Sequence, residues 1–430
     1  MSVRIIQGDC REVLKTIEAE SIDAVVTDPP YGIGFMGKEW DTFKPGSARQ
    51  PERLEKSKPI VSDNPNLNGR CRSPAISPSQ IAYDESLTGR RGFQMWTEEW
   101  AREVLRVLKP GGHLLCCGAP RSYHRMACGI EDAGFEVRDA VLWLFGQGFP
   151  KSHNLKGDNE GWGTALKPCW EPILMARKPV IGTVAGTMER FGVGAINIDA
   201  CRIRGGNGSG VWGSSNKDCG DKRTFNASPD ASEYRSEQHK AGRWPGNVIH
   251  DGSEEVLESF AEFGNNKGAI APVYRRRADK FRTAYGAFKG NVDEGGSTFQ
   301  GDSGTAARFF YCAKASRADR DDGMSGFGKM PLHWSQGDKS PGTFQSKNTD
   351  RAARNSHPTV KPTELMRYLC ALVTPLGGLV LDPFMGSGST GRGAQLGGFS
   401  FIGIDKEAEY VEIARARITA IGPLFAEVSA

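Results

Sequence analysis

The chain has 430 residues, more than the roughly 100 to 200 of a typical single domain, so we expect two domains or one core with a large insertion. Its 54 glycines make up about 13% of the residues, well above the usual ~7%, and predict an unusually high loop content. The 55 basic and 51 acidic residues give a net charge of +4, which excludes a strongly basic electrostatic binder but permits an anionic partner.

Strand and helix patterns alternate through the N-terminal part of the chain. Short branched or apolar runs indicate strands, and apolar residues at helical spacing indicate helices. We predict strands at 4–7, 22–27, 113–118, 136–146 and 171–179, and helices at 10–17, 96–108 and 123–134. This alternation predicts a wound α/β sheet.

Two stretches break this rhythm. Residues 42–92 are rich in Pro, Ser, Arg, Asn and Gly, and we predict a long mobile loop there. Residues 180–355 are rich in Gly, Ser and Asn with little periodicity, and we interpret them as an irregular inserted region. The predicted organisation is therefore an N-terminal part at 1–179, an insert at 180–355 and a C-terminal part at 356–430.

The C-terminal part again alternates helix and strand patterns. We predict helices at 361–373, before Gly397 and at 408–418, with strands at 378–384 and 399–405. The turn "MGSGSTG" follows the first of these strands, and Asp405 ends the second. Glycines let the backbone approach a ligand, and an acidic residue at the next strand tip can accept bonds from ribose hydroxyls, so this pattern predicts a nucleoside site. By itself it fits a dinucleotide site as well as a methyl-donor site.

The tetrapeptide Asp28-Pro29-Pro30-Tyr31 ends the predicted strand at 22–27. Two prolines cannot continue a sheet ladder, so a carboxylate, a free carbonyl and an aromatic ring project from a stiff tip. Two oxygen acceptors can hold an exocyclic amino group on a flat ring while the tyrosine stacks on that ring. Acceptors that bend the nitrogen toward tetrahedral geometry make its lone pair available for attack. A plain strand terminator is the alternative reading.

These two motifs together resemble the DNA amino-methyltransferases, which modify adenine N6 or cytosine N4 with S-adenosylmethionine. "TDPPYG" at 27–32 precedes "DPFMGSGST" at 382–390, and this order resembles the beta class, a circular permutation of the Rossmann-like methyltransferase sheet. The resemblance implies that both ends of the chain form one sheet and that the insert serves target recognition. It also implies that Asp28, Pro29, Pro30 and Tyr31 form the catalytic tip.

The resemblance further implies a cofactor site. Asp405 would hold the ribose, Asp9 would approach the adenine, and the glycine turn would surround the methionine part. "HPTVKP" at 357–362 resembles the segment that closes the methionine end. The residues implied are Asp9, His357, Lys361, Pro362, Asp382, Phe384, Gly386, Gly388, Ser389, Thr390 and Asp405.

Aspartate rather than serine before the two prolines favours adenine N6 as the target, with cytosine N4 as the alternative. More distant alternatives are a non-catalytic DNA-binding module on the same fold, a protein glutamine methyltransferase and a nicotinamide oxidoreductase. Pro168-Cys169 is similar to the nucleophile pair of cytosine C5 enzymes. Amine methylation needs no thiolate, so we interpret Cys169 as a packed strand-edge residue.

We expect double-stranded DNA as the partner, because a base inside a duplex must be flipped out to reach the tip. The segment 273–290 mixes basic and aromatic residues, which could meet phosphates and stack on bases; a solvated basic helix is the alternative. The candidate DNA contacts are Arg275, Arg276, Arg277, Lys280 and Arg282. The sequence does not decide between a monomer and a homodimer.

The cellular setting is predicted from what the sequence lacks. No apolar run reaches the ~18 residues of a membrane span, and the N-terminus does not have the pattern of a signal peptide. The ten cysteines include no CxxC pair, and His250 and His357 have no Cys or His partners at ligand spacing. We expect a cytoplasmic protein with reduced thiols, no membrane partner and no metal.

Overall fold

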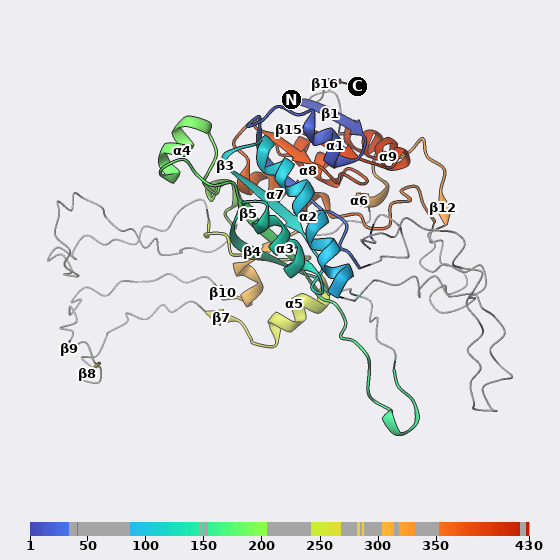
Figure 1. The fold of residues 1–430 in the computed structure, drawn as a ribbon. Helices are drawn as coiled ribbons and strands as arrows, with labels where there is room; N and C mark the ends of the chain where they lie inside the picture. The colour runs from blue at the N-terminus through green and yellow to red at the C-terminus, as the bar shows by residue number, and fades with distance from the viewer. Residues whose placement is uncertain are drawn as a thin grey trace.

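The computed structural model describes residues 1–33, 41, 87–146, 148, 154–203, 242–267, 282–283, 286–287, 303–313, 318–331, 352–421 and 427–429. Within these ranges a large sheet runs through the molecule with helices on both of its faces (Figure 1). Among the described residues no helix is long and apolar enough to cross a membrane.

The sheet has the strand order β11-β6-β4-β5-β3-β2-β14-β15-β1-β16. Its strands are β1 (Ser2–Gln7), β2 (Ile22–Thr27), β3 (Leu108–Cys117), β4 (Glu136–Leu144), β5 (Trp170–Arg177), β6 (Val248–His250), β11 (Tyr311–Cys312), β14 (Leu379–Asp382), β15 (Ser400–Asp405) and β16 (Glu427–Ser429). Neighbouring strands are parallel, except that β5 runs antiparallel to both β3 and β4. The C-terminal strands β14 and β15 lie between the N-terminal strands β2 and β1, so the two ends of the chain share one sheet.

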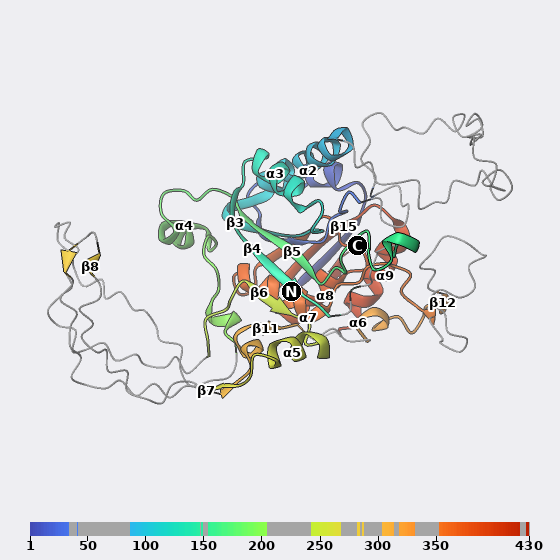
Figure 2. The ribbon, with the colours of Figure 1, turned by 90° about the horizontal axis from the view of Figure 1, so that it is seen from below.

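Two apolar clusters cover the two faces of the sheet. Helices α1 (Cys10–Lys15), α2 (Leu87–Val107) and α3 (Tyr123–Asp132) supply one cluster, and α7 (Thr363–Val373), α8 (Ser389–Leu396) and α9 (Ala408–Thr419) the other (Figure 2). In β2, Val25 packs into the first cluster and Ala24 and Val26 into the second. Successive strand residues point to opposite faces, which is why this strand is apolar nearly throughout.

The remaining elements are small and lie outside the centre of the sheet. They are α4 (Val184–Phe191), α5 (Glu254–Ala261), α6 (Ala318–Asp321), β7 (Asn266–Lys267), β8 (Arg282–Thr283), β9 (Gly286–Ala287), β10 (Ser303–Gly304), β12 (Met330–Pro331) and β13 (Ala352–Ala353), with 3-10 turns at Gly157–Asn159, Asp199–Cys201 and Ala306–Phe309.

The predicted α/β sheet is confirmed, but two predicted boundaries are wrong. Helix α2 begins at Leu87 rather than at Trp96, inside the stretch 42–92 that we predicted as a loop. Its buried face continues to Phe93, which is 3% exposed, and this packing outweighs the glycines and arginines around it. Strand β3 begins at Leu108 rather than at residue 113, so it also includes residues 108–112. Residues 42–86 lie outside the described residues.

The predicted insert contributes strands to the main sheet. Both β6 and β11 come from residues 180–355, and β6 pairs with β4 to extend the sheet beyond it. The limits of the three predicted parts, and the circularly permuted class, stay predictions.

Candidate active site

Four parallel strands carry an aspartate at the same edge of the sheet. Asp405 and Asp382 are the last residues of β15 and β14, and Asp9 and Asp28 come just after β1 and β2. Gln7 is in register with Asp405, and Asp382 with Gly403. Parallel strands end at one edge, where open α/β sheets bind ligands, so the predicted catalytic and cofactor residues come together there.

The Asp28 carboxylate is the centre of a polar cluster. Its Oδ1 accepts a 2.7 Å hydrogen bond from the Tyr31 hydroxyl, and its Oδ2 lies 2.9 Å from the Lys361 ammonium. Lys361 Nζ also donates to the Tyr31 hydroxyl oxygen over 2.9 Å. The sequence placed Lys361 near the methionine end of the cofactor site, and in the structure its ammonium contacts Asp28 and Tyr31.

Glu171 belongs to the same cluster, and the sequence analysis missed it. Its Oε2 lies 3.2 Å from Lys361 Nζ and accepts a 3.4 Å hydrogen bond from the Tyr31 hydroxyl. Because β5 runs antiparallel, its second residue lies at the edge where β3 ends, with Cys117 opposite Ile173. The only signal in the sequence was an acidic residue at the start of an apolar strand.

Burial and charge set the protonation of this cluster. Burial raises the pKa of Tyr31 well above its usual value, and the nearby carboxyls of Asp28 and Glu171 raise it further. Burial alone would lower the pKa of Lys361, but Asp28 and Glu171 outweigh this and the net direction is upward. At neutral pH the site therefore contains a phenol and an ammonium.

The glycine turn and Asp405 form the second half of the site. Gly386 N–H donates to Asp405 Oδ2 over 2.8 Å and Glu407 N–H donates to Oδ1 over 2.9 Å. Gly386 and Gly388 have φ angles of +50° and +80°, in the left-handed region that favours glycine. A Cβ on Gly386 would lie 2.8 Å from His357 Nε2, so glycine there also permits a close approach. Burial raises the pKa of Asp405, and its backbone hydrogen bonds oppose that change.

Asp382 connects the glycine turn to strand β2. Its Oδ1 accepts a 2.6 Å hydrogen bond from Thr27 Oγ1 and a 3.0 Å bond from the Phe384 N–H. The side chain is 1% exposed, and burial raises its pKa to about 7 although hydrogen bonds from Thr27, Thr390 and Phe384 oppose this.

The other predicted cofactor residues surround this turn. The Phe384 ring packs against Trp96 and Trp100, with centroids 5.4 and 5.3 Å apart. Burial lowers the pKa of His357 to about 4, so its imidazole is neutral at pH 7. Ser389 and Thr390 are buried in the first turn of α8, and Pro362 is buried directly before α7.

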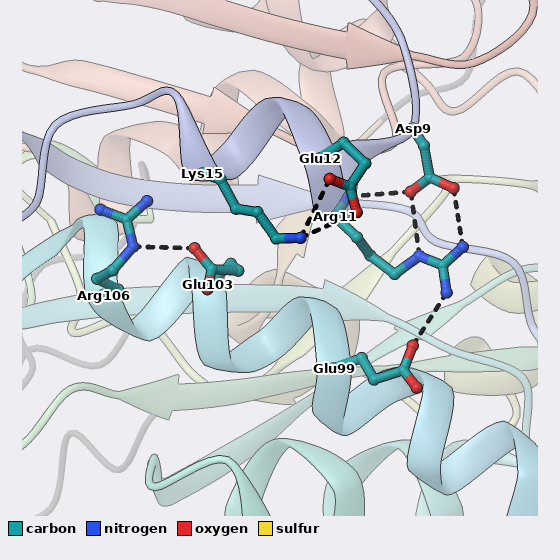
Figure 3. Close-up of polar contacts among 7 residues, drawn as sticks. All are labelled: Asp9, Arg11, Glu12, Lys15, Glu99, Glu103 and Arg106. Carbon is teal, nitrogen blue, oxygen red and sulfur yellow. Dashed lines mark hydrogen bonds and ion pairs between the residues drawn. The ribbon is translucent and has the colours of Figure 1, made fainter.

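Asp9 lies at the same edge but is already engaged within the chain (Figure 3). It caps α1 by accepting from the Arg11 N–H, and both of its oxygens accept from the Arg11 guanidinium over 3.1 and 2.8 Å. Arg11 also bonds to Glu99 of α2 over 2.9 Å. The pKa of Asp9 is lowered, mainly by the Arg11 hydrogen bond. Its predicted contact with the cofactor's adenine stays a prediction.

Asp41 is a further residue that the sequence analysis missed. It is 1% exposed, and its carboxylate accepts from the backbone N–H groups of Gly32 and Ile33 over 2.6 and 3.2 Å. These bonds fix the turn that follows Tyr31.

Cys169, which we interpreted as packed, is exposed, because it lies just before β5 begins rather than in the strand.

The predicted DNA contacts fall almost entirely outside the described residues. This is the case for Arg275, Arg276, Arg277 and Lys280, while Arg282 is described only as backbone in β8. Among the described residues, no group of three or more His, Cys, Asp or Glu could hold a metal ion.

Comparison with known families agrees with this geometry. The family model of N6/N4 methyltransferases, described as DNA methylase, matches residues 22–416. The chain belongs to this DNA methylase family. The expected membership of the N6/N4 DNA methyltransferase family is thereby confirmed.

Individual relatives match over shorter stretches. The type II methyltransferase M.HindIII of Haemophilus influenzae is 26% identical over 203 residues, 43% of this chain and 61% of that protein. M2.DpnII of Streptococcus pneumoniae, also a type II methyltransferase, is 50% identical over 64 residues, 15% of this chain and 24% of that protein. The chain thus matches less than two thirds of the length of either relative.

Solved structures of similar overall extent also match. A DNA modification methylase of Thermus thermophilus is 16% identical with a TM-score of 0.40, covering 99% of this chain and 98% of its own. The PvuII cytosine-N4-specific DNA methyltransferase is 12% identical with a TM-score of 0.43, covering 97% and 86%.

Proposed function

We propose that this chain is a site-specific DNA methyltransferase that uses S-adenosylmethionine to methylate the exocyclic N6 of a flipped adenine. The observation that carries the proposal is the short distance between the two halves of the site. The Thr27 hydroxyl, one residue before Asp28, bonds to Asp382, four residues before Gly386. The amine-binding tip and the nucleoside turn thus open at adjacent points of the same sheet edge.

The residues at the edge fit S-adenosylmethionine. Each Asp405 oxygen accepts one backbone N–H, which leaves a further lone pair on each for ribose hydroxyls. Gly386 and Gly388, both with positive φ, have no side chain that would separate a ligand from the backbone at this edge. The neutral His357 lies against Gly386. When bound, the cofactor supplies an electrophilic methyl group on a sulfonium.

The tip residues position the target amine. In our proposal Asp28 and the Pro29 carbonyl accept the two N–H bonds of the amino group, and the Tyr31 ring stacks on the base. The lone pair of this nitrogen would receive the methyl group as its bond to the cofactor's sulfonium sulfur breaks, which would leave a neutral thioether, and the nitrogen would then lose one proton to solvent. The Lys361 ammonium lies 2.9 Å from Asp28 Oδ2, so the acceptor carboxylate is paired with a positive charge.

Adenine is the favoured target because Asp28 stands where cytosine N4 enzymes more often have serine. Cytosine N4 methylation is the second candidate, since Asp28 and Tyr31 would hold either amino group. We further propose double-stranded DNA as the substrate. We propose the cytoplasm as the location, because it contains DNA and keeps the cysteine thiols of proteins reduced.

Labelled methyl transfer tests the proposal directly. The full chain is incubated with S-adenosylmethionine carrying a tritiated methyl group and with DNA of mixed sequence, and the DNA is then digested to nucleosides. We expect label in N6-methyladenine. Label in N4-methylcytosine would support the second candidate, and absence of labelled base on every DNA tested would contradict both.

A further inference from the structure

The two donors that bind Asp28 are the Tyr31 hydroxyl and the Lys361 ammonium, and both also lie near a second acceptor, a carboxylate oxygen of Glu171. Glu171 Oε2 lies 3.2 Å from Lys361 Nζ and 3.4 Å from the Tyr31 hydroxyl. The corresponding distances to Asp28 are shorter, 2.9 and 2.7 Å. In this structure Asp28 is therefore the first partner of both donors and Glu171 the second.

This arrangement makes the target amino group compete with two donors at Asp28. Tyr31 already donates to Oδ1 and Lys361 to Oδ2, which leaves one further lone pair on each oxygen, and the amino group would bind more strongly if either donor moved away. A donor displaced from Asp28 loses a charge-assisted hydrogen bond, and the Lys361 side chain is only 8% exposed, so water cannot readily replace it. An unpaired buried ammonium would strongly oppose entry of the base.

We propose that Glu171 is a positioning residue for methyl transfer, which accepts the hydrogen bonds of Lys361 and Tyr31 when the target amino group replaces them at Asp28. This inference rests on the proposed function. A small shift of each donor toward Glu171 suffices, because both already lie within or near hydrogen-bond distance of it. Glu171 thereby frees Asp28 without leaving a buried charge unpaired.

The position of Glu171 on a paired strand suits this role. Glu171 is opposite Trp143 of β4, and the next residue, Pro172, accepts a 2.9 Å hydrogen bond from the Gly118 N–H at the end of β3. The backbone of Glu171 is thus held between two strands while its side chain, 23% exposed, points to the cluster. A rigidly placed acceptor loses little entropy when the donors move to it.

Glu171→Gln tests this role, because glutamine keeps the length and one oxygen acceptor but removes the negative charge. We expect single-turnover methylation to slow roughly 10- to 100-fold, the range for a lost charge-assisted hydrogen bond. The dissociation constant of S-adenosylmethionine and the Tm should stay close to wild type. Glu171→Asp, which keeps the charge, should recover part of the rate. Glu364→Gln is the matched control, since Glu364 pairs with Arg367 on the neighbouring helix and does not contact Asp28.

The pH profile distinguishes this role from a merely structural one. Loss of the anion beside Lys361 must lower the pKa of its ammonium, so the alkaline fall in rate should begin at lower pH in Glu171→Gln than in wild type. NMR titration of labelled lysine, assigned with Lys361→Arg, follows the same proton without requiring turnover. An unchanged rate in Glu171→Gln, or an unchanged Lys361 titration, would overturn the inference.

The wild-type chain in the same assay separates this inference from the proposed function. If wild type methylates DNA and Glu171→Gln is equally fast, the role of Glu171 is wrong and the function stands. If wild type transfers no label to any DNA, the proposed function fails, and with it the role of Glu171 in transfer. If Glu171→Gln does not fold, the charge-retaining Glu171→Asp is used in its place. In either variant, a loss of methylation rate accompanied by an equal loss of S-adenosylmethionine affinity would count against a positioning role.

Discussion

The Thr27 hydroxyl donates a 2.6 Å hydrogen bond to Asp382 Oδ1, and this bond joins the two halves of the proposed active site. Both side chains are buried, and their strands β2 and β14 are adjacent in the sheet. The catalytic tip and the glycine turn each begin directly beyond this bond. Their relative position therefore depends on the sheet rather than on flexible loops, as a preorganised site requires.

Asp28→Ala should abolish methyl transfer while preserving cofactor binding. The substitution removes the carboxylate that would hold the amino group, and loss of one preorganised group that stabilises developing charge costs roughly 100-fold or more in rate. Asp405 and the glycine turn are untouched, so calorimetry should give a near wild-type dissociation constant for S-adenosylmethionine. Asp139→Ala, at an exposed position on β4, is the control. A fully active Asp28→Ala enzyme would exclude the assigned role.

Asp405→Asn should weaken S-adenosylmethionine binding by roughly 10- to 100-fold, because hydroxyl bonds to a carboxylate are stronger than those to an amide. The N–H groups of Gly386 and Glu407 bond to different oxygens of Asp405, so an amide would turn its NH2 group toward one of these donors. Titration calorimetry measures the change. Glu407→Gln, an exposed neighbour, should bind like wild type, and equal affinity in both variants would argue against a ribose contact.

Asp382 should make the cofactor-free protein less stable as pH rises from about 4 to about 7. Its folded pKa is raised to about 7 from 3.8, so in this range the unfolded chain has lost the proton that the folded chain keeps. The free energy of unfolding should fall by up to a few kcal/mol, at about 1.4 kcal/mol per pKa unit, and level off above pH 7.

Asp382→Asn isolates this contribution, because asparagine can still accept from Thr27 and Phe384. Chemical denaturation of both proteins at several pH values should show their stability difference changing between about pH 4 and 7 and constant above. A difference that is independent of pH would mean that Asp382 is ionised in the folded protein throughout.

Gly388→Ala should destabilise the protein more than Gly398→Ala. The two glycines have similar φ angles of +80° and +83°, so both substitutions introduce about 1–2 kcal/mol of backbone strain. A Cβ at Gly388 would also lie 2.9 Å from Ala414 Cβ in α9, whereas no atom lies within 4 Å at Gly398. We expect an additional loss of about 1–3 kcal/mol for Gly388→Ala in urea denaturation. Equal losses would show that α9 can move to accommodate the methyl group.

The sequence by itself determined the alternation of strands and helices and the identity of both motifs. Short apolar runs end in "DPPY" and "DPFMGSG", and these residues have local conformational requirements that hold in any context: prolines end a ladder, and glycines adopt positive φ. Helix α2 shows the limit of such local reasoning. Its first turns contain glycines and arginines, yet Phe93 packs into the core and extends the helix.

Only the tertiary structure decided which distant residues meet. Lys361 was predicted for the cofactor side but contacts Asp28, and Glu171 was not predicted at all. The position of Glu171 depends on the antiparallel direction and register of β5, and the contact of Arg11 with Glu99 depends on the packing of α1 against α2. Strand direction and pairing arise from long-range packing, which residue patterns along one segment do not encode.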